Sequence, residues 1–227
     1  MTSHGTEGHV YIHEDVVVRA TRTAAYLANQ GSWWSFSEEY RYDLVGIFGQ
    51  LRPAGRWPRA VNLWEADWHR IEHVFDEQFG TPATQAPVDE RHNDWWRRSA
   101  GDRSGGWDRL MVPGPGSRAL AELQEGTPRP CVVQQVIALR HGAQQDFLAW
   151  VGERVPAAVD GSGWELLMSL RALHGSTATV LYGAPTWDGV GQLAGLLPVP
   201  DPDWRPEVTT SLLQAWEGSA LLQRGAA

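Results

Sequence analysis

Hydrophobic and polar residues alternate along the chain in two successive series of strand-like and helix-like segments. The elements predicted for the first series are strand 10–19, helix 21–40, strand 42–51 and strand 59–66. The turn-forming sequence RPAGRWP (52–58) joins the last two strands into a hairpin. Asp67 then stands at the N-cap position of a predicted amphipathic helix over 68–79.

The second half of the chain repeats this order. Its predicted elements are strand 131–142, helix 143–161, strands 164–173 and 176–185, a helical or loop segment 186–197 and a last helix 207–222. An ungapped overlay of the halves matches VYIHEDVVVRA with VVQQVIALRHG, YDLVG with WELLM, and NLWEA with VLYGA. In this overlay His13 falls on Gln135.

Each half therefore shows the order β-α-β-β-α with room for a closing strand, which is the order of a ferredoxin-like plait. The predicted fold class is α+β, with two tandem ferredoxin-like plaits that form a dimeric-type α/β barrel. The predicted boundaries are 1–113 for the first half, 114–130 for a connector and 131–227 for the second half.

Four segments carry a resemblance to the NIPSNAP family of the dimeric α/β-barrel superfamily. They are the strand, turn and helix VVQQVIALRHGAQQDFLAW, the aromatic-led strands YDLVG and WELLM, the strand end LWEAD, and DWWRRSAGDRSGGWDRLMVP at 94–113. NIPSNAP-like chains show an arginine in the first strand, where this chain has His13 and Gln135. The resemblance implies a superfamily of cofactor-free monooxygenases, isomerases and cyclases of secondary metabolism, which also includes haem enzymes.

Composition and charge narrow the possible partners. The chain has 19 basic and 27 acidic residues and a net charge of -8, which argues against binding to nucleic acid phosphates. Cys131 is the single cysteine, so neither an internal disulfide nor a cysteine metal cage can form. No apolar run reaches the ~20 residues of a membrane span, and the N-terminus lacks a signal-peptide pattern. We therefore expect a cytoplasmic protein with no membrane partner and, by the fold, a homodimer.

Side-chain alternation in the first strand selects the first catalytic candidates. Tyr11, His13, Asp15 and Val17 share one face, and the mostly apolar other face is expected to meet the helices. We predict His13 as a general acid or base, because imidazole titrates near neutral pH, with Asp15 as its supporting carboxylate. The alternative is an interface pair without a catalytic role.

The third strand and the tryptophans supply the remaining candidates. Asn62 and Trp64 share a face and are predicted to orient a substrate, although Trp64 can equally be the core tryptophan of the plait. Glu65, on the opposite face, is a third catalytic candidate if it is buried. Trp33, Trp34 and Trp95 are further candidates for pocket walls, with packing of helices onto the sheet as the alternative.

Cofactor signals are weak throughout the sequence. His69 and His73 stand four residues apart on a predicted helix but lack a third ligand, so we expect a solvated face and no metal. No phosphate loop, dinucleotide fingerprint or nucleophile motif occurs. We expect no cofactor, while haem stays open because it needs only one well-placed histidine in an apolar pocket.

Three functional hypotheses follow. The first is a cofactor-independent enzyme of bacterial secondary metabolism that acts on a hydrophobic aromatic or polyketide-like molecule by acid/base chemistry such as cyclisation, isomerisation or dehydration. The second is a haem-dependent or cofactor-free oxygenase of the same fold. The third is a non-catalytic module that binds a ligand or forms oligomers.

Overall fold

The computed structural model describes residues 8–35, 42–51, 58–68, 90–197 and 200–222, and these form two similar halves. The first half contains β1 (His9–Val18), α1 (Thr23–Gly31), the 3-10 turn Ser32–Ser35, β2 (Tyr42–Gln50), β3 (Arg59–Asp67), α4 (Glu90–Asp102) and β4 (Arg103–Pro113). The second half contains β5 (Cys131–Ala138), α6 (Gln144–Val159), β6 (Glu165–Ala172), β7 (Thr177–Ala184), α7 (Val190–Leu196), the 3-10 turn Pro202–Trp204 and β8 (Glu207–Ala215). The short helix α5 (Leu120–Gln124) lies between β4 and β5.

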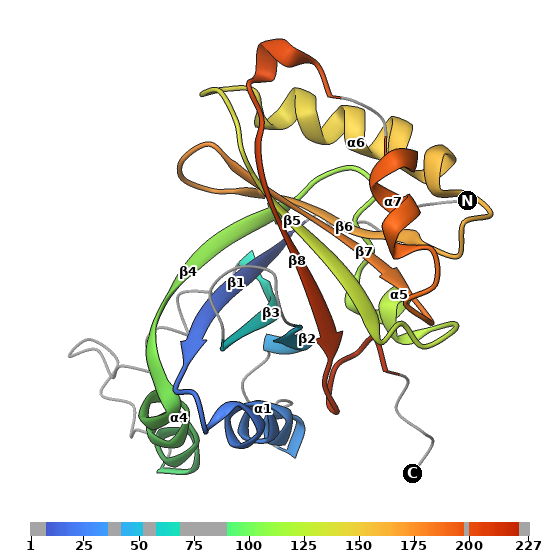
Figure 1. The fold of residues 1–227 in the computed structure, drawn as a ribbon. Coiled ribbons are helices and arrows are strands. Elements are labelled where there is room, and N and C mark those ends of the chain that lie inside the picture. The colour runs from blue at the N-terminus through green and yellow to red at the C-terminus, as the bar shows by residue number, and fades with distance from the viewer. Residues whose placement is uncertain (1–7, 36–41, 52–57, 69–89, 198–199, 223–227) are drawn as a thin grey trace.

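The strands form a closed barrel in the order β1-β3-β2-β8-β5-β7-β6-β4, and neighbouring strands are antiparallel (Figure 1). Each half contributes the order of a ferredoxin-like plait, β4-β1-β3-β2 or β8-β5-β7-β6. The halves meet at two seams, where Phe48–Gln50 of β2 pairs with β8 and Met111–Pro113 of β4 pairs with β6. The structure thus confirms the predicted α+β fold with two tandem plaits.

The same bulge in both halves fixes which residues are equivalent. The pairing of β2 with β3 shifts between Leu44 and Gly46, opposite Trp64 and Leu63. The pairing of β6 with β7 shifts between Leu166 and Met168, opposite Tyr182 and Leu181. The halves are therefore related by an approximate twofold axis along the barrel, with Leu63 equivalent to Leu181.

This equivalence corrects the sequence overlay of the first strands by one residue. His13 pairs with Leu63, and Gln134 pairs with Leu181, so Gln134 rather than Gln135 is the counterpart of His13. A slip of one residue exchanges the two faces of a strand, because side chains alternate with a period of two. The ungapped overlay matched apolar letters without information on pairing and so compared residues of opposite faces.

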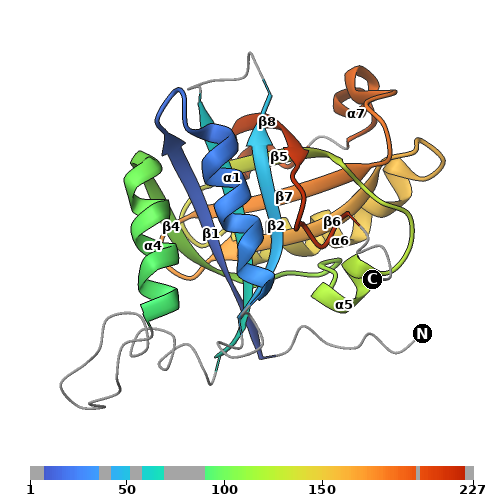
Figure 2. The same ribbon diagram turned by 90° about the horizontal axis from the view of Figure 1, so that it is seen from below.

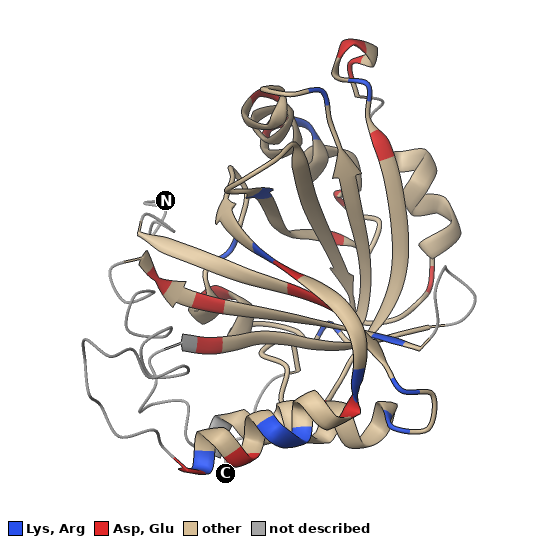
Figure 3. Ribbon diagram, turned by 90° about the vertical axis from the view of Figure 1, so that its left-hand side faces the viewer, with Lys and Arg blue, Asp and Glu red and all other residues tan. Residues whose placement is uncertain are grey.

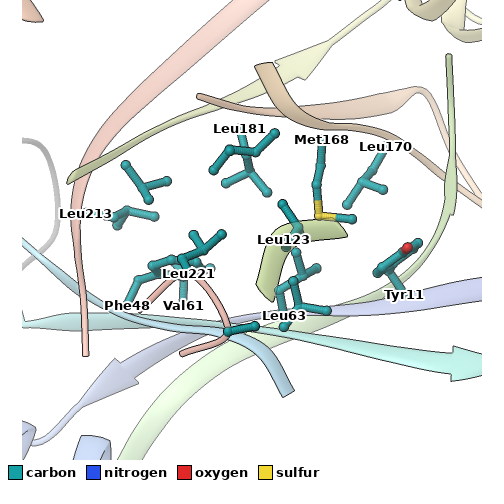
Figure 4. Close-up of a cluster of buried hydrophobic side chains, with 14 of the residues drawn as sticks. Tyr11, Phe48, Val61, Leu63, Leu123, Met168, Leu170, Leu181, Leu213 and Leu221 are labelled. Carbon is teal, nitrogen blue, oxygen red and sulfur yellow. The ribbon is translucent and has the colours of Figure 1, made fainter. Parts of the chain in front are cut away.

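Helices cover the outside of the barrel, and three apolar clusters hold the layers together. Helices α1 and α4 lie side by side on the outer face of the first half, and α6 and α7 lie on the second half (Figures 1 and 2). The third cluster fills the barrel, where Leu63, Met168, Leu181 and Leu213 from opposite sheets point toward one another (Figure 4). One end of the barrel is closed by Leu123 of α5 and by the segment after β8.

The C-terminal segment departs from the prediction of a helix over 207–222. Residues Glu207–Ala215 form β8, which pairs with β5 along its length and with β2 at its end. This strand completes the second plait, so tertiary pairing overrides the local helical pattern. The predicted helix at 68–79 lies outside the described residues.

The barrel closes within one chain, so a second copy is not needed to complete it, and the expected homodimer stays a prediction. None of the described helices has both the length and the apolar run that a bilayer span requires.

Candidate functional site at the barrel mouth

The inward face of β1 changes from apolar to polar along the barrel. Tyr11 belongs to the apolar cluster in the barrel, whereas Val10, Val16 and Val18 belong to the cluster under the helices. His13 and Asp15 continue the inward face, and both are buried. The structure therefore confirms the predicted orientation of this strand, with His13 and Asp15 inside the barrel.

A pocket of about 370 Å³ opens at the end of the barrel that lies away from α5. It is lined by Asp15, Val17, Arg59, Gly106, Trp107, Arg109, Gln134, Val136, Thr209 and Ser211. Its walls thus come from β1, β3 and β4 of the first half and from β5 and β8 of the second. The volume lies in the range of ~300–1,000 Å³ that is typical of pockets for small molecules. We call this pocket the mouth pocket.

His13 adjoins the mouth pocket without lining it: it pairs with the lining residue Arg109 and has no exposed surface. Its ring meets the edge of Trp107 at a centroid distance of 5.2 Å, and the Gln134 side chain lies beside it without a well-formed hydrogen bond to either ring nitrogen. Burial lowers the pKa of His13 to about 4; the Gln134 side chain opposes this shift, and the charges of Arg109 and Arg59 add to it. The imidazole is therefore neutral at neutral pH.

Asp15 is held by an arginine rather than by His13. The guanidinium of Arg59 donates from Nε to Oδ1 at 2.7 Å, and its Nη2 donates to Oδ2. Bidentate pairs of this kind are strong and fix the orientation of both groups. The predicted support of His13 by Asp15 is not among the observed contacts, so Asp15 contributes a neutralised ion pair to the pocket wall.

Arg109 is the cation of the mouth pocket without an acidic partner among the described residues. Its guanidinium lies 3.8 Å from the Trp107 ring centroid, and its Nη1 is buried without a hydrogen bond. The approach of β4 to β1 depends on Gly106, whose φ is +141° and where a Cβ atom would lie 2.4 Å from the Asp15 carbonyl oxygen. Glycine here lets β4 bring Trp107 and Arg109 beside Asp15 and His13.

The second half shows that the barrel does not require these residues. The strand pairings make Gln134, Val136, Thr177, Thr209 and Ser211 the counterparts of His13, Asp15, Arg59, Trp107 and Arg109. The counterparts are all uncharged, and β5 and β7 contain no charged residue (Figure 3). The two halves therefore have the same backbone arrangement, but the histidine, the acid and the two arginines occur at these positions only in the first half.

Glu65, the third predicted catalytic residue, lies near the other end of the barrel. Its Oε2 accepts hydrogen bonds from the Tyr11 hydroxyl at 2.6 Å and from the Leu120 backbone N–H at 3.1 Å. The His9 Nδ1 lies 3.1 Å from Oε1. Glu65 is buried, as its predicted role requires, but it fastens α5 across the barrel end and the structure does not bring it to the mouth pocket.

The predicted substrate-binding residues lie under the helices of the first half. Trp33, Trp64 and Trp95 are buried against one another, with ring centroids 5.0–6.0 Å apart. Asn62 is buried beside them and donates to the Glu14 carboxylate at 2.7 Å. These residues therefore seal α1 and α4 onto the sheet on the face opposite the mouth pocket. Trp34 belongs to the 3-10 turn after α1, and its side chain lies outside the described part.

A second pocket of about 240 Å³ lies between the helices and the sheet of the second half. Its apolar wall includes Phe147, Trp150 and Val155 of α6, and the Tyr182 hydroxyl donates to Gln135 Oε1 at 3.3 Å. Burial raises the pKa of Tyr182, which keeps the phenol neutral. The described lining residues contain no histidine, cysteine or carboxylate, so this pocket offers packing and one neutral polar pair.

Sequence reasoning missed four residues of the mouth pocket, namely Arg59, Trp107, Arg109 and Gln134. They lie on three different strands, β3, β4 and β5, and no local motif connects them. The signal that could have found them is the comparison of the two halves in the correct register.

The buried neutral His13 predicts an acid-sensitive fold. The unfolded chain binds a proton near pH 6.5, whereas the folded chain binds it near pH 4, so the free energy of unfolding falls as the pH drops through this window. We expect His13→Gln to reduce this loss by about 3 kcal/mol, since one pKa unit corresponds to about 1.4 kcal/mol. Urea unfolding curves recorded between pH 4 and pH 7, at intervals of about half a pH unit, measure the free energy of unfolding of both proteins. Parallel curves for both proteins would contradict the prediction.

Known structures share this architecture at low sequence identity. A protein from Fusobacterium nucleatum, provisionally assigned as a monooxygenase, matches with a TM-score of 0.60 and 9% identity over 91% of this chain and 92% of its own. A chlorite dismutase variant from Candidatus Nitrospira defluvii gives 0.55 and 9% identity over 94% and 93%, and an anthrone oxidase-like protein gives 0.55 and 8% over 96% and 97%. The sequence matches no family model and no curated protein at a significant level. The comparisons therefore show the dimeric α/β-barrel fold, and membership of the NIPSNAP family stays a prediction.

Proposed function

We propose that the chain is an enzyme that carries out acid/base chemistry on a small molecule bound in the mouth pocket, with His13 as the proton carrier. The observation that carries this proposal is the asymmetry of the barrel interior. Charged and aromatic residues gather on one half, while the equivalent positions of the other half are filled by uncharged residues. A purely structural role does not account for a buried histidine that makes no well-formed hydrogen bond and lies near two arginines.

The geometry supports enolisation as the elementary step. A neutral imidazole accepts the proton from a carbon next to a carbonyl group, and the electron pair of the broken C–H bond moves to the carbonyl oxygen. The positive charge of Arg109, which has no acidic partner among the described residues, stabilises the enolate oxygen electrostatically as its charge develops. His13 then returns the proton to another position, which gives isomerisation, or to a leaving hydroxyl group, which gives dehydration.

Contact between the substrate and His13 requires a side-chain movement. Trp107 and Arg109 line the mouth pocket, whereas His13 lies behind them and has no exposed surface. Rotation of the Trp107 side chain, which is half-buried, opens the path to the imidazole. The indole also offers an aromatic wall, which favours the hydrophobic aromatic or polyketide-like substrate proposed from the sequence. A place in bacterial secondary metabolism belongs to the same proposal.

Haem does not fit either pocket, so we derive no step through it. In the second pocket the group available as an axial ligand is Tyr182, and its raised pKa opposes the phenolate form. The pocket also falls below the usual size for small-molecule sites. In the mouth pocket, charged groups of Asp15, Arg59 and Arg109 occupy the walls where a porphyrin needs apolar faces. We therefore propose a cofactor-independent reaction.

Exchange of carbon-bound hydrogen with D2O tests the proposal without knowledge of the natural substrate. The probes are phenylpyruvate, benzoylacetate and the uncharged benzoylacetone, each followed by NMR. We expect faster exchange with the enzyme than without it for at least one probe.

Two neighbouring tryptophan substitutions locate the reaction. Thr209 and Val208 are adjacent in β8, but Thr209 lines the mouth pocket and Val208 lines the second pocket. We expect Thr209→Trp to reduce exchange about tenfold or more, because a lost binding contact of ~1.4 kcal/mol already gives this factor, and Val208→Trp to leave it unchanged. Thermal unfolding of both variants controls for stability. Loss of exchange in Val208→Trp alone would move the site to the second pocket and overturn the proposal.

A further inference from the structure

We propose that the ligand of the mouth pocket is a compact monoanion, a carboxylate on a small flat body, and that Arg109 binds its charged group. This inference rests on the proposed function in using the same pocket, and it adds the chemical class of the substrate.

The charges in the pocket leave one cation without a partner. Arg59 neutralises Asp15 through its bidentate ion pair. Arg109 stacks on Trp107 and retains a buried Nη1 donor without a hydrogen bond. A buried guanidinium donor that lacks a partner costs free energy, and a carboxylate satisfies it with a planar, two-pronged acceptor.

One neutral polar side chain of the mouth pocket, that of Gln134, favours the same ligand. Gln134 Oε1 is buried beside His13 and makes no well-formed hydrogen bond in the described part of the chain. Gln134 lies on the inward face of β5, because it pairs with Leu181 of the cluster inside the barrel. An amide oxygen suits a ligand that carries a donor, such as an enol or hydroxyl group, near its carboxylate.

One excess positive charge favours a monoanion over a phosphate dianion. A dianion would place a second negative charge beside Asp15, whose carboxylate is already matched by Arg59. The apolar walls formed by Val17, Val136 and the Trp107 ring are suited to the flat apolar part of an organic acid. The geometry thus points to an aromatic or enolic carboxylate with a single ring.

Calorimetric binding of matched acids and amides tests the charge. The probes are benzoate, phenylacetate and 3-phenylpropionate, each compared with its uncharged amide, and inorganic phosphate. We expect at least one acid to bind more tightly than its amide. Equal binding of acids and amides, no binding of any acid at millimolar concentration, or tighter binding of phosphate would each overturn the inference.

Variants assign the charge to Arg109. We expect Arg109→Gln to weaken binding of the acid about 10- to 100-fold, which corresponds to the loss of a charged hydrogen bond, and Arg109→Lys to weaken it less. Arg154→Gln is the matched control, because Arg154 is an exposed arginine of α6 outside the pocket. An unchanged affinity in Arg109→Gln would overturn the assignment.

The outcome separates this inference from the proposed function. If acids bind through Arg109 but His13→Gln exchanges hydrogen at the wild-type rate, the anion site stands and the acid/base role of His13 fails. The opposite outcome has three parts: exchange depends on His13, the neutral benzoylacetone reacts as fast as the keto acids, and the amides bind as tightly as the acids. In that case the anion site fails and the acid/base role stands.

Discussion

Glu14→Ala is expected to lower the free energy of unfolding by about 3–5 kcal/mol, the usual effect of removing one partner of a buried charge pair. The Glu14 carboxylate is buried on the helix side of β1 and accepts hydrogen bonds from Asn62 at 2.7 Å, Trp64 at 2.9 Å and Arg103 at 3.0 Å. Alanine leaves the Arg103 charge and two neutral donors without this acceptor. The Tyr26 hydroxyl keeps bonds to Asn62 and Arg103 and so limits the loss.

Two control variants separate charge from packing in this network. Glu14→Gln retains an oxygen acceptor but not the charge, and we expect a smaller loss of about 1–3 kcal/mol. Glu153→Ala removes an exposed glutamate on α6 and should change stability by less than about 0.5 kcal/mol. Urea unfolding with a common m-value measures all three. A loss below about 1 kcal/mol in Glu14→Ala would show that the network contributes little.

His13→Gln is expected to lower the rate of the exchange reaction by about 10²–10⁴-fold, the usual contribution of a general acid or base. Glutamine should fit, because Gln134 occupies the equivalent position of the second half without disturbing the barrel. The variant therefore removes the proton carrier while the interior keeps a polar side chain of similar size. Wild-type rates in His13→Gln would contradict the proposed role.

The pH profile distinguishes proton transfer from a structural effect of the same substitution. The wild-type rate should fall as the pH drops through about 4, because protonated His13 can no longer accept a proton. The residual activity of His13→Gln should not show this fall in rate. A fall in rate at the same pH in both proteins would show that a group other than His13 titrates.

The sequence predicted the architecture because hydrophobic periodicity and internal repetition are strong signals. Alternation in VYIHEDVVV placed His13 and Asp15 on one face, and the match of NLWEA with VLYGA agrees with the pairing of Leu63 and Leu181 seen in the bulges. The last strand was predicted as a helix, because its assignment depends on pairing with β5 and β2, which the local pattern does not contain.

The candidate site was only partly predictable, for two physical reasons. Side-chain alternation shows which residues of a strand share a face but not which face lies inside the barrel. Asn62 and Trp64 were therefore predicted to bind a substrate, whereas they pack under the helices. Arg59 and Arg109 reach the mouth pocket from strands far apart in sequence, and charge at a strand position usually indicates solvent exposure. Pairing between strands, rather than local pattern, brings them beside His13.

The closure of the barrel by a single chain has a consequence for what its interior can hold. In a barrel made from two identical subunits, every inward residue near the axis meets its own copy. A second His13, Arg59 and Arg109 would then crowd like charges into one cavity and raise their desolvation cost. With both plaits on one chain, Gln134 and Ser211 can stand opposite the histidine and the arginine. Because the two halves are encoded separately in one chain, the sequence of each half can change without the other. A site on the axis can therefore be unsymmetrical and bind an unsymmetrical ligand, whereas two identical subunits would impose twofold symmetry on it.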